Sequence, residues 1–205
     1  MSRRALILVD IQKDFMKGGS LEVPNAEEIL PVVNELLLEK EWDLVVATKD
    51  WHSEDHKSFA SNHDGKNVFD VIKLNGVEQV IWPDHCVQGS IGAELHEDLD
   101  VGLIDEIIVK GTNLEVDSYS GFYNDNSRVF DSGLSDILDD TGIEEVYIVG
   151  LATDYCVKFT ALDSVDLGFE TYVITDGVRG LGGTGEALVE MQTSGINLTT
   201  SEAIV

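Results

Sequence analysis

Cys156 is the residue of this sequence with the clearest chemical potential. It follows an expected buried strand, residues 146–149, which is apolar and ends at Gly150, and it opens an expected helix. The unpaired N–H groups of a helix start favour a thiolate over a thiol and can also receive an oxyanion. A lone cysteine is more often a small buried hydrophobic residue. The place of Cys156 after a strand favours a nucleophile instead.

A carboxylate and an ammonium group end two other expected strands. Asp10 closes the apolar run 5–10, and Lys110 closes the run 106–110. Alone, each could be an ordinary surface charge. With Cys156 they form a coherent set, because Asp10 can accept the thiol proton and return it to a leaving amine while Lys110 balances its charge. This pattern predicts a cysteine hydrolase that works without a catalytic histidine.

Four further side chains could bind a metal ion. Asp50 and His52 form an Asp-x-His pair, His56 follows shortly after, and His85 lies further along the chain. Carboxylate and imidazole ligands of this kind suit zinc, iron or manganese. Asp-x-His alone also occurs as a pair of surface or core side chains. Whether His56 would bind directly or support another ligand stays open at this point.

Aromatic side chains occur near these polar residues. Phe15, Trp82 and Tyr119 could form the walls of a site for a flat ring, although each alone could equally belong to the core. Thr153 and Asp154 are expected to cap the helix that carries Cys156. Cys86 is interpreted as a packing residue.

The elements that must position these residues alternate between strand and helix. A parallel sheet with helices on both faces is the arrangement typical of such alternation, so we predict a doubly wound α/β fold. In this fold ligands bind beyond the carboxyl ends of the strands, where the candidate residues lie. The expected strands are 5–10, 43–48, 79–82, 106–110, 146–149 and 171–175, and the expected helices are 26–40, 91–99, 134–140, a segment from about Cys156 to 167, and 186–194.

Length and charge restrict the functional classes. The 205 residues suit one domain, 1–205, with an ordinary hydrophobic content of 43%. Thirteen basic against 39 acidic side chains give a net charge of −26, which argues against binding nucleic acid or an anionic membrane. Either a solvated surface or adaptation to high salt would explain this charge. The sequence contains no expected export or membrane-spanning segment, so a cytoplasmic location is predicted.

Four segments carry a resemblance to a known family. They are ALILVDIQKDF, TKDWHSEDHKSFA, WPDHCVQGSIGAELH and VGLATDYCVKFTALD, and the match extends over residues 5–179. In order and spacing they resemble the isochorismatase-like cysteine hydrolases, and within that family the nicotinamidases (pyrazinamidases). The resemblance implies a Rossmann-like three-layer fold.

The resemblance also implies roles for individual residues. It implies a cis peptide bond between Leu151 and Ala152. It further implies a catalytic triad of Asp10, Lys110 and Cys156, with the oxyanion held by the amides of Ala152 and Cys156. It implies a divalent metal ion, zinc in preference to iron or manganese, held by Asp50, His52 and His85. It also implies a ring pocket that includes Phe15, Trp82 and Tyr119.

The activity that the resemblance implies is hydrolysis of nicotinamide to nicotinate and ammonia through a Cys156 thioester, in NAD salvage. Action on pyrazinamide is expected as well. Two alternatives remain, a carbamoyl or ureido amide hydrolase of the same fold and a catalytically silent binding domain. The expected partner is the small-molecule substrate, and whether the chain forms a homo-oligomer is left open.

Overall fold

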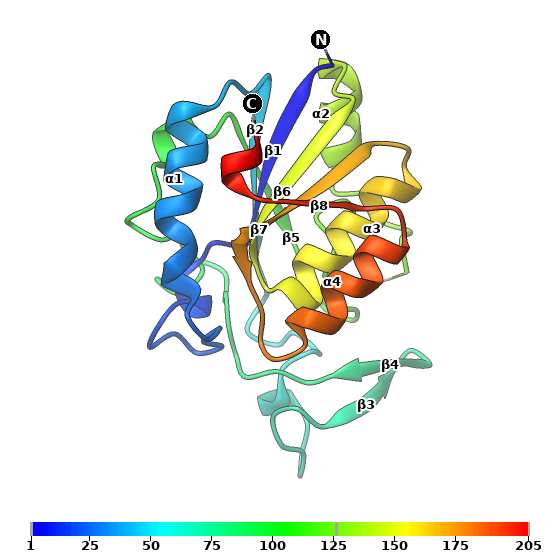
Figure 1. Ribbon diagram of the computed structural model, residues 1–205. Helices are drawn as coiled ribbons and strands as arrows, with labels where there is room; N and C mark the ends of the chain where they lie inside the picture. The colour runs from blue at the N-terminus through cyan, green and yellow to red at the C-terminus, as the bar shows by residue number, and fades with distance from the viewer. Residues whose placement is uncertain (1, 126, 205) are drawn as a thin grey trace.

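A six-stranded parallel sheet forms the centre of the fold (Figure 1). The computed structural model describes residues 2–125 and 127–204. The strand order is β5-β2-β1-β6-β7-β8, so β1 and β6, the strands that precede Asp10 and Cys156, lie at the middle of the sheet. The strands are β1 (Arg4–Val9), β2 (Leu44–Asp50), β5 (Glu106–Lys110), β6 (Glu145–Leu151), β7 (Glu170–Arg179) and β8 (Asn197–Thr199).

Helices cover both faces of this sheet. Helix α1 (Ile29–Glu39) packs on one face, and α2 (Leu134–Thr141), α3 (Lys158–Asp166) and α4 (Thr184–Thr193) pack on the other (Figure 1). Because successive side chains of a strand point to opposite faces, Leu6 and Leu8 join the core on the α1 side while Ala5 and Ile7 join the other. The predicted doubly wound α/β fold is confirmed. Strand β8 had no counterpart in the sequence prediction.

A small antiparallel hairpin lies beyond the carboxyl edge of the main sheet (Figure 1). It consists of β3 (Val71–Leu74) and β4 (Val77–Val80), joined by Asn75 and Gly76 at φ 50° and 86°. Both values are left-handed, as a tight hairpin turn requires. The strand expected at 79–82 therefore begins two residues earlier and pairs outside the main sheet.

The helix predicted for residues 91–99 is wrong. This segment is a series of turns whose backbone groups bond to the loop that follows β1. Lys13 N donates to Glu94 O at 3.0 Å, and His96 N donates to Ile11 O at 2.9 Å. These bonds replace the local pairing that a helix needs, so the apolar spacing of the segment reflects contacts with a distant loop rather than a helical face.

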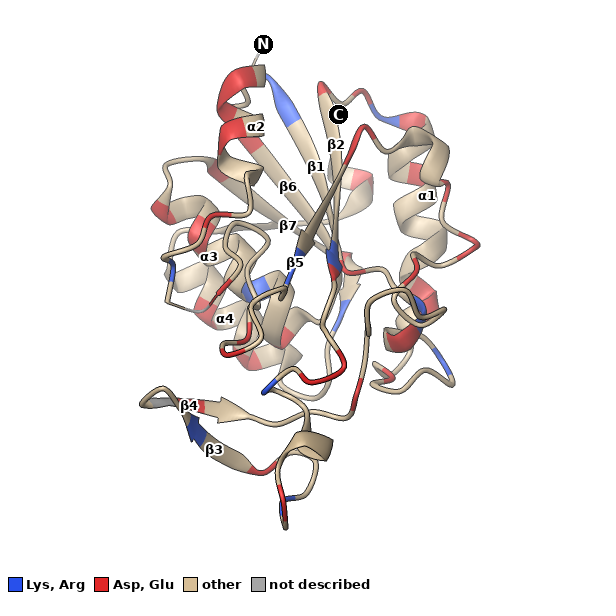
Figure 2. Ribbon diagram, turned by 180° about the vertical axis from the view of Figure 1, so that it is seen from behind, with Lys and Arg blue, Asp and Glu red and all other residues tan. Residues whose placement is uncertain are grey.

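Acidic residues occur at many positions along the helices and loops (Figure 2). Within the described parts of the chain, every helix is too short or too polar to cross a membrane.

Candidate active site

Cys156 lies in the tight turn that follows the central strand β6. The peptide bond between Leu151 and Ala152 is cis, as the resemblance implied. The chain then forms a single π-helical turn, Thr153–Val157, which leads into α3. The helix thus starts slightly earlier than predicted, and Cys156 occupies its first turn. The Cys156 side chain is 7% exposed and faces a cavity at the carboxyl edge of the sheet.

Lys110 connects the groups at this edge. Its ammonium group is fully buried and lies 2.9 Å from Asp10 Oδ2 and 2.5 Å from Asp50 Oδ1. It also donates to Ser118 O at 3.2 Å and lies 3.4 Å from Cys156 Sγ. Burial alone would lower the pKa of Lys110, but the attraction of Asp10 and Asp50 outweighs this effect. The pKa of Lys110 therefore stands well above its ordinary value. The lysine is therefore a cation that pairs with both carboxylates beside the thiol.

Two contacts orient the side chain of Asp10. Asp10 follows β1 with φ 49°, and its Oδ1 accepts a hydrogen bond from the Thr48 hydroxyl at 2.6 Å. Its Oδ2 faces Lys110, and one of its two carboxylate oxygens lies within 4.8 Å of the Cys156 sulfur. Burial raises the pKa of Asp10, with Lys110 opposing and Asp50 adding to the rise. A more basic carboxylate is a better acceptor for a thiol proton.

The protonation state of Cys156 differs from the sequence expectation. Burial raises the pKa of the thiol well above its ordinary value, Lys110 lowers it, and Asp10 and Asp50 raise it again. Desolvation and two carboxylates thus outweigh the favourable effect of the helix start. The thiol retains its proton at neutral pH, so a neighbouring base must remove it before attack.

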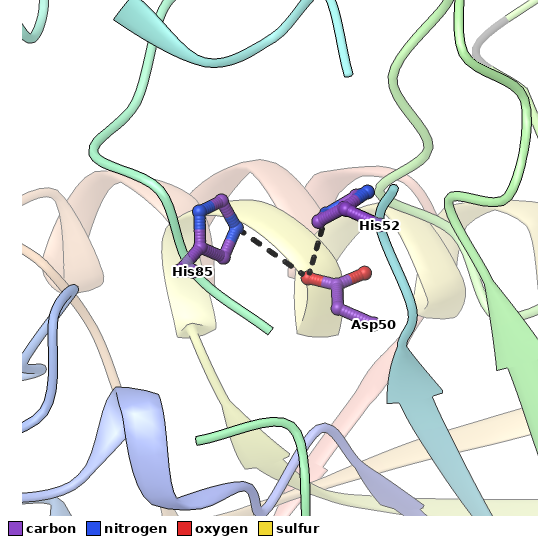
Figure 3. Close-up of side chains that lie close together, drawn as sticks. All are labelled: Asp50, His52 and His85. Carbon is purple, nitrogen blue, oxygen red and sulfur yellow. Dashed lines mark ion pairs between the residues drawn. The ribbon is translucent and has the colours of Figure 1, made fainter. Parts of the chain in front are cut away.

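Asp50, His52 and His85 form a group with the properties of a metal site (Figure 3). The Nδ1 atoms of the histidines lie 2.8 Å from carbonyl oxygens, His52 from Gly111 O and His85 from Pro83 O. Each Nδ1 therefore donates its proton, which leaves both Nε2 lone pairs free. These Nε2 atoms lie 3.8 and 3.9 Å from Asp50 Oδ2, too far for hydrogen bonds. Bonds of about 2 Å would span such gaps, so the three residues fit a divalent ion.

Gln12 fixes the position of Asp50, a role that the sequence did not indicate. The Gln12 amide donates to Asp50 O at 2.8 Å, and its oxygen accepts from Asp50 N at 2.7 Å. Asp50 in turn uses Oδ1 for Lys110 and Oδ2 for the space between His52 and His85. One carboxylate therefore joins the thiol group and the metal group.

His56 lies beside His52 but is not part of the group of Asp50, His52 and His85. Its ring centroid is 4.4 Å from that of His52, and its Nδ1 pairs with the Ser58 hydroxyl at 2.7 Å. Its Nε2 is buried without a hydrogen-bond partner among the described residues. Burial, reinforced by His52, lowers its pKa to about 4, so the ring is neutral. His56 approaches His52 and Asp117 closely but does not join the group of Asp50 and His85.

The cavity beside Cys156 brings the three predicted aromatic residues together. Trp82 meets Tyr155 edge to face at 4.9 Å and Tyr119 at 6.4 Å between ring centroids, and Phe15 contributes another wall. Flat apolar walls of this kind suit a planar ring. The lining consists of Phe15, Leu21, Asp50, Trp82, His85, Asp117, Tyr119, Ala152, Tyr155, Cys156 and Leu181.

Comparison with known protein families decides which family this arrangement represents. The model of the isochorismatase domain matches residues 4–203. The chain belongs to the isochorismatase family. A curated nicotinamidase of Escherichia coli is 45% identical over 98% of this chain and 96% of its own length.

Two solved structures similar to this chain agree with this assignment. A nicotinamidase/pyrazinamidase from Acinetobacter has a TM-score of 0.94 and 42% identity, covering 100% of this chain and 99% of its own. A pyrazinamidase of Pyrococcus horikoshii, solved in complex with zinc, has a TM-score of 0.77 and 40% identity, covering 97% and 99%.

Several lining residues of this isochorismatase-family pocket were not predicted. Leu21, Tyr155 and Leu181 are apolar residues of loops or turns, and in the sequence they look like any other core residue. Asp117 is 2% exposed and accepts a hydrogen bond from the Gln79 amide at 3.0 Å. It lies in the long loop after β5, where spacing carries no structural period.

The expected helix caps are wrong. The residue that precedes the π-helical turn is Ala152, and no side-chain hydrogen bond caps that turn. The hydroxyl of Thr153 is buried without a partner among the described residues. Asp154 points away from its own helix and accepts three backbone N–H groups of the loop before α4.

Proposed function

We propose that this protein hydrolyses nicotinamide to nicotinate and ammonia. One observation carries the proposal: the Cys156 thiol and the metal-site residues Asp50 and His85 line the same cavity. The thiol lies beside the Lys110–Asp10 ion pair, and Asp50 connects that pair to a group suited to a divalent ion. Near full-length identity of 45% to a curated nicotinamidase supports it. The enzyme is thus an amidohydrolase that acts on a linear carboxamide.

The nucleophile is Cys156, and Asp10 is its base. The Asp10 carboxylate takes the thiol proton, the sulfur attacks the carboxamide carbon, and Asp10 returns the proton to the departing ammonia. A thioester to Cys156 remains. Asp10 then removes a proton from water, and hydrolysis releases nicotinate and restores the thiol. Lys110 keeps the carboxylate oriented and balances its charge throughout.

The backbone N–H groups of Ala152 and Cys156 are assigned to the oxyanion. Ala152 lines the cavity in an extended conformation, and its carbonyl oxygen accepts hydrogen bonds from Tyr155 N and Val157 N. These hydrogen bonds form the first turn of the helix, so the backbone amides of that turn lie close to the Cys156 sulfur. In comparable sites one such donor contributes about 3 to 4 kcal/mol to the transition state.

Asp50, His52 and His85 would hold the metal ion, for which we propose zinc before iron or manganese. When bound, the ion supplies a Lewis acid for the ring nitrogen of the substrate. The side chains of Phe15, Trp82 and Tyr119 hold the ring by its faces and edges. His56 is assigned a supporting position beside His52.

The same pocket should accept pyrazinamide, which matches nicotinamide in size and shape. Carbamoyl or ureido compounds fit less well, because they lack a ring nitrogen for the metal group and a flat face for the aromatic walls. A silent binding domain would have no use for the combination of Asp10, Lys110 and Cys156.

We further propose that residues 1–205 act as one domain in the cytoplasm, in salvage of NAD. The proposed partner is the small-molecule substrate. Every proposed site residue comes from this chain.

Ammonia release from nicotinamide by the purified protein tests the proposed function. Release should depend on added zinc after chelation and should disappear in Cys156→Ala. The matched control is Cys86→Ala, which removes the other buried cysteine and should retain activity. A folded, metal-loaded protein that releases no ammonia from nicotinamide would contradict the proposal.

A further inference from the structure

The carboxylate of Asp154 holds the loop between β7 and α4. Asp154 Oδ1 accepts the N–H of Leu181 at 3.0 Å, and Oδ2 accepts those of Gly182 at 3.0 Å and Gly183 at 2.8 Å. Three N–H groups on one carboxylate form a strong and directional contact. These bonds cross 27 to 29 positions of sequence, so they connect two segments that would otherwise be independent.

The backbone of this loop packs tightly around the carboxylate. A Cβ atom on Gly180 would lie 2.8 Å from Asp154 Oδ1 and 2.4 Å from the Thr184 hydroxyl, closer than real contacts allow. Helix α4 begins at Thr184, so the carboxylate also lies at the positive end of a ten-residue helix. Close packing and charge both favour one position of the loop.

The loop supplies one wall of the active-site cavity. Leu181 lines the cavity together with Cys156 and the aromatic residues. Asp154 itself lies in the same π-helical turn as Cys156, two residues before it. The element that positions the nucleophile therefore also contacts the loop that carries this cavity-lining leucine.

We propose that Asp154 is a positioning residue that holds Leu181 against the substrate ring and so restricts the site to unsubstituted monocyclic carboxamides. This inference rests on the proposed function. Asp154 does not touch the reacting atoms. Loss of its bonds should let Leu181 withdraw and should enlarge the cavity at one edge of the ring, while the thiol and its base stay in place.

The test compares Asp154→Asn with Leu181→Ala on nicotinamide and on its 5-methyl and 6-methyl derivatives. An amide side chain keeps the size of the carboxylate but cannot accept three N–H groups through two oxygens. Both variants should raise the ratio of kcat/KM for one methylated substrate to that for nicotinamide by about 10-fold, the effect of one methyl group in an apolar pocket. KM for nicotinamide should rise while kcat changes little, since lost ring contact is uniform binding.

A double variant separates positioning from general damage. If Asp154 acts through Leu181, the double variant Asp154→Asn/Leu181→Ala should have nearly the same ratio of kcat/KM values for the methylated substrate and nicotinamide as Leu181→Ala alone. The matched control is Asp176→Asn, because Asp176 also anchors a loop, accepting Ser201 N at 3.0 Å, but does not line the cavity. It should lower thermal stability without changing the substrate ratio.

A second pair tests the contact from the loop if Asp154→Asn does not fold. Gly182→Pro removes one N–H donor to Asp154, and Gly182→Ala retains it in a position with no atom within 4 Å of the new methyl group. Only the proline variant should change the substrate ratio. An unchanged ratio in Asp154→Asn, or effects of Asp154 and Leu181 that simply add, would overturn the inference. Failure of the wild-type protein to hydrolyse nicotinamide would instead overturn the proposed function.

Discussion

Replacement of Lys110 by methionine should destabilise the protein strongly. Lys110 is fully buried and contacts the carboxylates of Asp10 and Asp50, which are 0% and 3% exposed. Removal of the cation leaves two buried carboxylates without their partner. Breaking a buried ion pair from one side typically costs about 3 to 5 kcal/mol, and methionine restores little beyond the aliphatic stem.

The sign of the pH effect allows this cost to be measured at neutral pH. The pKa of Lys110 is raised in the folded protein, so its stabilising contribution is fully present below the ordinary lysine pKa of about 10.4 and is lost only as pH rises through the folded value. Unfolding at pH 7 therefore measures the whole contribution. Lys110 also opposes the rise in the pKa of Asp10, so its removal should raise the pKa of Asp10 further and favour the protonated form, which cannot act as the base. Loss of the base should lower kcat by at least about 100-fold.

Urea unfolding of the metal-depleted proteins would test this reasoning. The matched control is Lys49→Met in strand β2, one residue before Asp50. Lys49 is only partly buried, and its ammonium group lies 4.7 Å from the centre of the Trp51 ring. The control should lose at most about 1 kcal/mol. A Lys110→Met protein that loses no more than this control would show that the two carboxylates do not depend on the buried cation.

Two further substitutions probe the groups that orient the site. Gly111→Ala would place a Cβ 2.3 Å from His52 Cε1, so zinc affinity in a calorimetric titration should fall about 10- to 100-fold. The control is Gly65→Ala, at a similar left-handed φ but with no atom within 4 Å of the new methyl group, and it should bind zinc as the wild type does. Equal zinc affinities in the two variants would count against the metal-site assignment. Thr48→Val removes the hydroxyl that donates to Asp10 Oδ1 at 2.6 Å, a bond worth about 1.5 to 3 kcal/mol, and should lower kcat/KM roughly 10-fold or more. Unaltered steady-state kinetics in Thr48→Val would refute that role.

The sequence was informative wherever a chemical group ended a regular strand. Asp10, Asp50 and Lys110 close or follow apolar runs with a clear strand pattern, and parallel strands bring their carboxyl ends to one edge. Periodicity and residue type together were therefore enough to predict that these side chains converge. Cys156 followed for the same reason, because its turn comes directly after β6.

The sequence was uninformative where position depends on distant backbone. Residues 91–99 have helical apolar spacing, but their N–H and C=O groups pair with the loop after β1. Asp154 looks like a helix cap in sequence, and its carboxylate binds a loop 27 to 29 residues away. Gln12 likewise shows no local pattern that would reveal its two bonds to Asp50. Contacts of this kind are properties of the folded chain rather than of any short segment.

The most direct test of the central claim is carbon-13 NMR of pyridine-3-carbaldehyde, labelled at the aldehyde carbon, bound to the zinc-loaded protein. An aldehyde has no leaving group, so attack by the Cys156 sulfur should stop at the tetrahedral stage. The wild-type protein and Cys86→Ala should show a hemithioacetal resonance, and Cys156→Ala should show none. A free or merely hydrated aldehyde in a protein that actively hydrolyses nicotinamide, or the same resonance in Cys156→Ala, would contradict nucleophilic catalysis by Cys156.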